Sequence, residues 1–225
     1  TPESGSSSLQ NRSKESITSI LGRASYNYLE RYYAEFSFRE DGSSKFAKAN
    51  RWGFFPSLSL GWRISDESFM DFYKNKLGDL KIRGSYGILG NQNIPSYQTI
   101  VTYELYSNTY AFDNDVVGGA GYKFGNKNLK WEKSKTFNIG ADFSFLRGAL
   151  SGTFDYFHKT TSDILLAPQV PTVFGTSLSS ENIGEMKNHG WELTLNYRLK
   201  TGEFSHDFSG NIGDTQNKIT KLVGG

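Results

Sequence analysis

The sequence contains no cysteine. This absence excludes a disulfide framework, a thiol nucleophile and any cysteine-ligated metal centre within these 225 residues. Long apolar runs are also missing: the longest is Ile164 to Ala167, which is too short for a transmembrane helix. Charges of the two signs are nearly balanced, with 25 basic and 23 acidic side chains. We therefore predict no nucleic-acid partner, because such proteins carry a clear excess of positive charge.

Aromatic residues and glycine are abundant instead. Phe, Trp and Tyr make up 15% of the chain and there are 24 glycines, although the chain is hydrophilic overall. This composition favours an all-β fold. Eight segments alternate apolar and polar residues with a period of two, which is typical of strands with one apolar and one polar face. The expected strands cover residues 19–28, 32–39, 54–63, 80–88, 137–145, 150–156, 191–197 and 204–212.

The connections between these expected strands alternate between short and long. The short ones cover residues 29–31, 146–148 and 199–202, and the long ones cover residues 40–51, 89–132 and 160–183. A further connection, residues 64–78, falls on the short side and has room for a turn of helix. Short turns at one rim and long loops at the other are typical of outer-membrane β-barrels. The predicted fold class is therefore all-β, with antiparallel up-and-down strands of a large outer-membrane barrel.

Aromatic side chains gather beside the short turns, as in the girdles that mark the membrane–water boundary of such barrels. These residues are Tyr26, Tyr28, Tyr32, Trp62, Phe143, Phe145, Tyr197 and Phe204. The alternation by itself leaves a second fold open, a soluble β-sandwich whose apolar faces meet inside. Such a sandwich would be a carbohydrate-binding module, with exposed aromatic rings as a platform for sugars.

Several sequence blocks resemble those of SusC/RagA-type TonB-dependent outer-membrane transporters. Residues 39–46, Arg-Glu-Asp-Gly-Ser-Ser-Lys-Phe, are similar to the R-x-D-G-S-S-x-F block of that family. Residues 131–136, Trp-Glu-Lys-Ser-Lys-Thr, resemble its W-E-x-x-x-T strand entry. Further blocks in the order of the family are residues 52–57, 61–65, 80–87, 155–163 and 188–192. As an ordered set, the blocks cover about residues 17–222.

The resemblance implies a segment of a barrel of about 22 strands that is filled by a plug domain. It also implies outer-membrane localisation and gated import of glycans or peptides for nutrient uptake. The implied partners are a SusD-like surface lipoprotein, TonB, the plug of the parent protein, the transported substrate and membrane lipid. No plug or TonB-interacting segment is found among these residues, so we expect a fragment of about eight strands from the middle to late part of the barrel. We expect residues 1–15 to be a flexible polar tail or loop and residues 16–225 to be barrel.

The strand phases predict which side chains face the lumen of such a barrel. The charged residues in the polar phase are Arg23, Glu35, Arg39, Lys81, Arg83, Asp142, Asp155, Glu192 and Arg198. In a plugged barrel, most of them are expected to contact water and plug side chains. Residues 89–132 also supply aromatic rings that either stack on a substrate or pack the loop on itself. The candidate substrate-binding rings are Tyr103, Tyr106, Tyr110 and Phe112.

No residue is predicted to carry catalysis or to hold a metal or cofactor. His158, His189 and His206 lack metal-ligand spacing. Residues 113–115, Asp-Asn-Asp, offer oxygen atoms to calcium, but the rest of a calcium loop is missing, so we interpret them as a solvated loop tip. The glycines of residues 119–125 are interpreted as a flexible part of the long loop. An outer-membrane barrel enzyme is a third hypothesis, disfavoured because no catalytic constellation is present, and we predict a protein that is not an enzyme.

Overall fold

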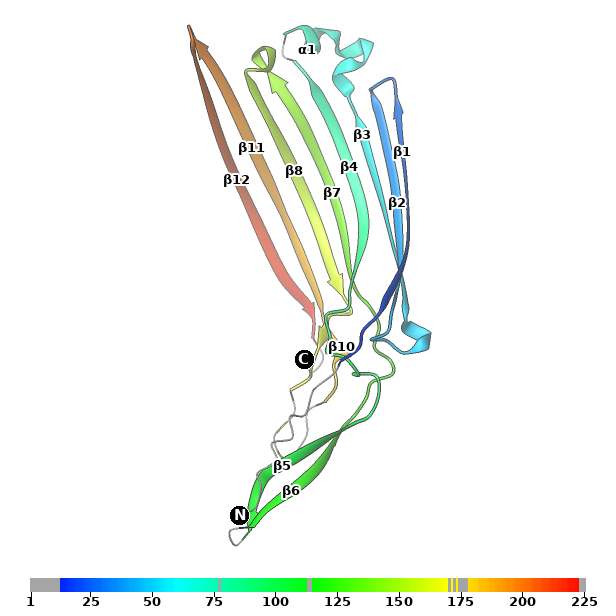
Figure 1. Ribbon diagram of the computed structural model, residues 1–225. Helices are drawn as coiled ribbons and strands as arrows, with labels where there is room; N and C mark the ends of the chain where they lie inside the picture. The colour runs from blue at the N-terminus through cyan, green and yellow to red at the C-terminus, as the bar shows by residue number, and fades with distance from the viewer. Residues whose placement is uncertain are drawn as a thin grey trace.

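The computed structural model describes residues 13–76, 78–112, 115–169, 171, 173 and 178–222. Its main feature is one eight-stranded antiparallel sheet in the order β1-β2-β3-β4-β7-β8-β11-β12 (Figure 1). The strands are β1 (Ile17–Tyr28), β2 (Tyr32–Ser43), β3 (Trp52–Trp62), β4 (Leu80–Asn91), β7 (Glu132–Phe145), β8 (Leu150–Ser162), β11 (Glu185–Thr201) and β12 (Phe204–Lys221). Each strand pairs with its neighbour along the chain once the two inserted hairpins are set aside, which is the predicted up-and-down arrangement.

The register of the sheet keeps one chemistry on each face. Across β2, β3 and β4, Ser37 pairs with Ser57 and Ser59 pairs with Ser85, while Leu58 pairs with Phe36 and with Tyr86 on the other face. A slip of one residue would exchange the two faces, so the alternating sequence itself fixes the register. We call the face that carries Ser59 the charged face and the face that carries Leu58 the apolar face.

The turns at one end of the sheet are tight, as predicted. Leu29 and Glu30 between β1 and β2 have φ of 52° and 54°, and Gly202 between β11 and β12 has φ of 63°. The longer connection between β3 and β4 contains the expected helical residues: η2 (Ile64–Asp66), η3 (Ser68–Met70) and α1 (Asp71–Lys76). Another short 3-10 helix, η4 (Leu146–Gly148), joins β7 to β8. Among the described residues, no helix is long and apolar enough to cross a membrane.

The opposite end of the sheet carries the long connections. Residues 89–132 were expected to be a loop, but they contain a hairpin of β5 (Thr102–Phe112) and β6 (Asp115–Lys123) that projects beyond the sheet (Figure 1). The glycines of residues 119–121 lie inside β6, so the interpretation of this stretch as a flexible loop was wrong. A second, very short pair is formed by β9 (Leu165–Leu166) and β10 (Glu181–Asn182), and η1 (Lys48–Asn50) follows β2.

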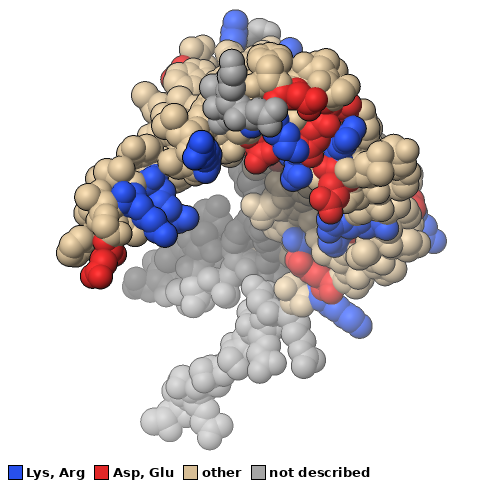
Figure 2. Space-filling view, turned by 90° about the horizontal axis from the view of Figure 1, so that it is seen from above, with Lys and Arg blue, Asp and Glu red and all other residues tan. Residues whose placement is uncertain are grey.

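The sheet is curved, and no second sheet covers its apolar face within the described part of the chain. Figure 2 looks down on the turn end and shows the sheet as an arc, with acidic and basic side chains gathered on its hollow side. On the apolar face, Leu60 is 54% exposed and Phe208 is 60% exposed. A sandwich would bury these side chains, so the structure confirms the barrel prediction and the sandwich alternative was wrong.

Candidate functional site

The nine charged residues predicted for the lumen all lie on the charged face. The register places Arg83 opposite Gly140, Gly140 opposite Asp155, and Asp155 opposite Glu192, so one row crosses four strands. Matching rows hold the remaining predicted residues on this face: Arg23, Glu35, Arg39, Lys81, Asp142 and Arg198. Because Figure 2 places the charged side chains on the hollow side of the arc, the charged face is the concave one.

Most of these charges are neutralised within the sheet. The ion pairs are Arg23–Glu35 at 2.5 Å, Arg39–Asp41 at 2.7 Å, Arg83–Asp142 at 2.9 Å, Arg83–Asp155 at 2.5 Å and Arg198–Asp207 at 2.6 Å. The ammonium group of Lys81 lies 4.5 Å from the centre of the Tyr33 ring, a cation–π contact. The two most exposed pairs, Arg23–Glu35 and Arg198–Asp207, each contribute little to stability. The combined effect of all the pairs is a hydrated wall with little net charge.

Arg83 is the centre of this network, because it reaches two carboxylates on two different strands. Its Nε donates to Asp142 on β7, and its Nη2 crosses over β7 to donate to Asp155 on β8. The crossing is possible because Gly140 lies beneath the guanidinium: a Cβ at this position would stand 2.6 Å from Asp155 Oδ1 and 3.0 Å from Arg83 Cζ. Two acceptors of the charged face, Asp155 Oδ1 and Asn188 Oδ1, are buried and have no hydrogen-bond partner among the described residues.

The apolar face carries an aromatic band at the turn end. The rings of Tyr26 and Tyr28, of Tyr28 and Tyr32, and of Tyr32 and Trp62 are stacked with centroids 6.3–6.5 Å apart. Glu67, in the turn beyond β3, accepts hydrogen bonds from the Tyr32 hydroxyl at 2.5 Å and from Trp62 Nε1 at 3.1 Å. The donors of Tyr32 and then Trp62 lower the pKa of the Glu67 carboxyl. An apolar ring with its polar tip bound at the rim is the arrangement expected at a membrane–water boundary.

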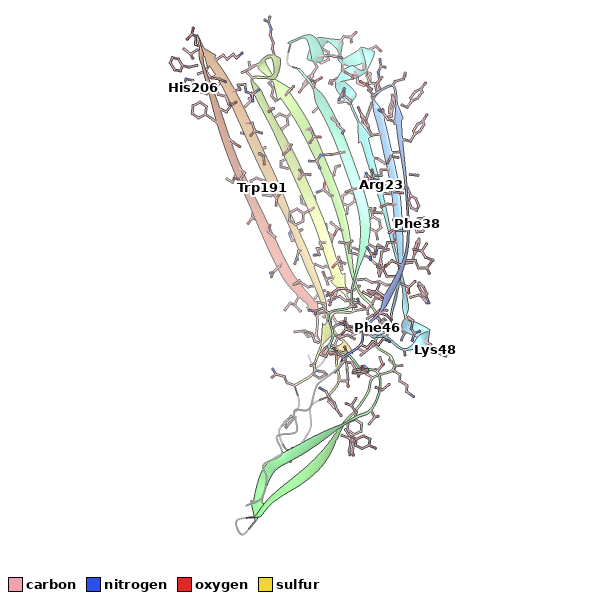
Figure 3. The ribbon with its side chains drawn as sticks, in the orientation of Figure 1. Arg23, Phe38, Phe46, Lys48, Trp191 and His206 are labelled. Atoms are coloured by element: carbon pink, nitrogen blue, oxygen red, sulfur yellow. The ribbon has the colours of Figure 1, made fainter. Side chains whose placement is uncertain are left out.

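The histidines lie on the apolar face and are not grouped as metal ligands. His158 pairs directly with His189 across β8 and β11, with ring centroids 6.3 Å apart. His206 lies at the turn end of the sheet (Figure 3), where its ring stacks on that of Phe208. Within the described ranges, no group of three His, Asp or Glu side chains is placed to hold a metal ion.

The long connections pack on a small hydrophobic core at the loop end of the sheet, where Figure 3 labels Phe46. This loop core consists of the buried residues Phe46, Phe55, Ile94, Leu129 and Trp131. Trp131 contacts Phe46 and Phe55 with ring centroids 5.2 and 5.3 Å apart, and its Nε1 donates to the carbonyl oxygen of Arg51 at 3.0 Å. Three connections that are distant in the sequence are therefore held together by one cluster of side chains.

The loop aromatics that were candidates for substrate binding lie on the projecting hairpin. Tyr103 on β5 is 78% exposed. Tyr106, Tyr110 and Phe112 also belong to β5, but their side chains lie outside the described residues. Asp113 and Asn114 of the calcium candidate lie outside the described residues as well, and Asp115 begins β6. The role of these residues in binding remains a prediction.

Two cavities open among the long connections at the loop end. The larger has a volume of about 850 Å³ and is lined by Asn50, Phe124, Asn126 and Lys130, among others. The smaller, of about 320 Å³, lies where the residues before β1 meet the connections after β2, β4 and β6. Neither cavity was predictable from the sequence, because the walls come from segments that are distant along the chain and carry no local motif.

A curved sheet with an exposed apolar face, a charged hollow face, an aromatic band and folded loops is a wall segment of an outer-membrane β-barrel. The chain belongs to the family described as "TonB dependent receptor-like, beta-barrel", whose model matches residues 1–224. The chain is thus part of an outer-membrane protein of the TonB-dependent receptor class, and its SusC/RagA-type resemblance is confirmed.

Individual relatives agree with this assignment. The chain is 41% identical to the TonB-dependent receptor SusC of Bacteroides thetaiotaomicron over 219 residues, which cover 94% of this chain and 22% of that protein. It is 36% identical to the TonB-dependent receptor P3 of Formosa agariphila, covering 93% of this chain and 21% of that protein. Among solved structures, the RagAB peptide transporter matches with a TM-score of 0.81 and 30% identity, over 92% of this chain and 22% of that chain. The chain therefore spans about a fifth of the length of the relatives it matches.

Proposed function

We propose that the chain forms part of the wall and the extracellular loops of a TonB-dependent importer that takes up glycans or peptides. The observation that carries this proposal is the division of a single curved sheet into an exposed apolar face and a charge-paired hollow face. An exposed apolar face on the convex side suits contact with membrane lipid, and a hydrated hollow face suits a lumen. The family of the chain supports the same function.

In this proposal, the nine charged residues of the hollow face line the lumen and meet the plug of the parent protein. The pairing within the sheet supports this role, because paired charges leave a nearly neutral, hydrated wall toward a plug and water. Asp155 Oδ1 and Asn188 Oδ1 are buried acceptors that a donor from a plug or from water would satisfy. The segment supplies no covalent chemistry, and we propose that the protein is not an enzyme.

The loops are proposed to contact the substrate. The loop core holds the long connections in a fixed arrangement, and the β5–β6 hairpin carries the exposed Tyr103 together with Tyr106, Tyr110 and Phe112. Aromatic rings can stack on sugar faces or pack against peptide side chains. We propose a SusD-like surface lipoprotein as a lid over these loops, and TonB as the source of energy through another part of the parent protein. The RagAB relative is described as a peptide transporter, and peptides are accordingly one of the two proposed substrate classes.

Uptake by whole cells tests this function. Cells with and without the gene for the full-length protein would be given fluorescent oligosaccharides in one arm and fluorescent peptides in the other. We expect deletion of the gene to abolish uptake in one arm, and loss of TonB to have the same effect. Undiminished uptake in both arms after deletion would refute the import function.

A loop variant connects the function to this segment. Tyr103→Ala on the projecting hairpin is expected to reduce uptake, because an exposed stacking ring is removed. Tyr26→Ala at the turn end is the matched control, since it removes the same ring from the opposite end of the sheet. Equal uptake by the two variants would show that the hairpin does not contact the substrate.

A further inference from the structure

The smaller cavity at the loop end has an excess of positive charge. Its wall includes the cationic side chains of Lys14, Lys45, Arg51 and Lys127 and one carboxylate, Glu15. Glu15 is already engaged: it accepts a hydrogen bond from Ser96 and pairs with Lys45 at 3.2 Å. These two contacts lower the pKa of the Glu15 carboxyl, with the Ser96 hydrogen bond as the larger cause, so the group is ionised at neutral pH. One cation of the four is therefore neutralised.

The other three cations have no acidic partner among the side chains that the structure describes. Lys14, Arg51 and Lys127 make no ion pair with a described carboxylate. Arg51 is the most telling, because its Nε is buried and has no hydrogen-bond partner within the described residues. A buried guanidinium nitrogen without an acceptor is costly, and an incoming oxyanion would satisfy it. Hydroxyl groups of Tyr97 and Thr99 lie in the same wall.

The larger cavity shares Lys127 with the smaller one, but other polar groups of its wall are already bonded within the loops. Asn126 Nδ2 donates to the carbonyl oxygen of Ser180 at 3.1 Å, and Asn182 Nδ2 donates to that of Lys130 at 2.8 Å. The ammonium group of Lys130 pairs with Asp163 at 3.0 Å. These polar groups of the larger cavity thus already serve the loop structure, and the smaller cavity, whose wall holds three unpaired cations, is the better candidate for a ligand.

We propose that the smaller cavity binds the oxyanion of an acidic sugar, a uronate carboxylate or a sulfate ester, on the substrate of the importer. Arg51 would form the planar, paired hydrogen bonds that suit such a group, and Lys127 and Lys14 would supply point charges. A volume of about 320 Å³ accommodates one sugar ring with its charged group. A peptide carboxyl terminus would meet the same three cations, so a tripeptide probe is needed to distinguish it from the acidic sugar. This inference rests on the proposed import function and narrows its substrate class.

Calorimetric titration of the full-length receptor in detergent tests the proposal. The probes are trigalacturonate, its fully methyl-esterified form as a neutral molecule with the same backbone, inorganic sulfate, and a tripeptide with a free carboxyl terminus. We expect trigalacturonate to bind and the methyl ester to bind at least about tenfold more weakly. Sulfate is expected to compete with trigalacturonate. Equal binding of the acid and the ester would overturn the proposal.

Variants locate the binding in this cavity. Arg51→Gln and Lys14→Gln are each expected to weaken trigalacturonate binding about tenfold or more, because each removes a charge-assisted contact. Lys14 is exposed and lines the smaller cavity but not the larger one, so its variant keeps the test informative even where Arg51→Gln perturbs folding. Lys130→Gln is the matched control, since Lys130 lines the other cavity and is paired with Asp163, and it should leave binding unchanged.

The remaining outcomes separate this inference from the import function. If the tripeptide binds and Arg51→Gln abolishes this binding, the cavity binds peptide carboxylates and the assignment to an acidic glycan is wrong. If cells import a neutral substrate and the receptor binds none of the acidic probes, the import function stands and the oxyanion site is refuted. If trigalacturonate binds through Arg51 but deletion of the gene changes no uptake, the site stands and the import function is refuted.

Discussion

The network around Arg83 gives a prediction whose sign the structure fixes. Replacing Gly140 by alanine would place a Cβ 2.6 Å from Asp155 Oδ1, 2.9 Å from the carbonyl oxygen of Phe154 and 3.0 Å from Arg83 Cζ. The backbone oxygen cannot move away easily, so the carboxylate and the guanidinium must separate. We expect Gly140→Ala to break the hydrogen bond from Arg83 to Asp155, which spans 2.5 Å.

Two effects of opposite sign determine the magnitude. A hydrogen bond between charged groups is worth about 1.5–3 kcal/mol, and this one is only partly exposed. Replacing glycine by alanine within a strand raises the free energy of unfolding by about 0.5–1 kcal/mol, because the unfolded chain has less conformational freedom to lose. The loss exceeds the gain, so Gly140→Ala should lower the free energy of unfolding by about 1–2 kcal/mol.

A glycine on the other face of the neighbouring strand is the matched control. A Cβ on Gly84 would meet only the carbonyl oxygen of Asn138, at an ordinary 3.8 Å. Gly84→Ala should therefore be neutral or stabilising. The assay is urea unfolding of the full-length receptor in detergent micelles, followed by tryptophan fluorescence. If Gly140→Ala and Gly84→Ala shift the unfolding free energy equally, Gly140 does not make room for the Arg83 crossing.

Two further predictions concern the turn end. The pKa of Glu67 is lowered from its usual 4.5 in the folded protein by the Tyr32 and Trp62 donors, so its contribution to stability is present above about pH 4.5 and lost as the pH falls through the folded value. Glu67→Gln should flatten the dependence of the urea midpoint on pH as the pH falls below about 4.5, and an unchanged pH profile would contradict this. Leu29 and Glu30 hold φ values of 52° and 54° that suit an Asn-Gly turn, so Leu29→Asn with Glu30→Gly should stabilise the receptor by about 1 kcal/mol. A lower urea midpoint for this double variant would contradict the prediction that the positive φ values of Leu29 and Glu30 cost stability.

The strands were predictable because their alternation is local. Residues 54–63 and 191–197 show the period of two in the sequence, and the structure places both in the sheet with the expected face on each side. The strands extend further toward the loop end than predicted, as in β11 (Glu185–Thr201) and β12 (Phe204–Lys221). The added residues, such as those of 213–218, are polar on both faces, so no alternation marks them.

The features at the loop end were not predictable, because they depend on contacts between distant segments. Trp131 was noted as part of a family block, but its packing against Phe46 and Phe55 spans more than 70 residues of chain. The β5–β6 hairpin lacks the alternation of the other strands and contains several glycines. The unpaired cations of Arg51 and Lys127 become a cluster only when the loop core brings their connections together.

The apolar face is proposed to meet lipid and the charged face to meet the lumen. This proposal is tested most directly by spin labels placed one at a time on Ser57, Leu58, Ser59 and Leu60 of β3, in a cysteine-free background of the full-length receptor in lipid bilayers. We expect frequent collisions with oxygen dissolved in lipid at positions 58 and 60 and rare collisions at positions 57 and 59. Uniform oxygen access along the four positions, or the opposite alternation, would contradict the proposal.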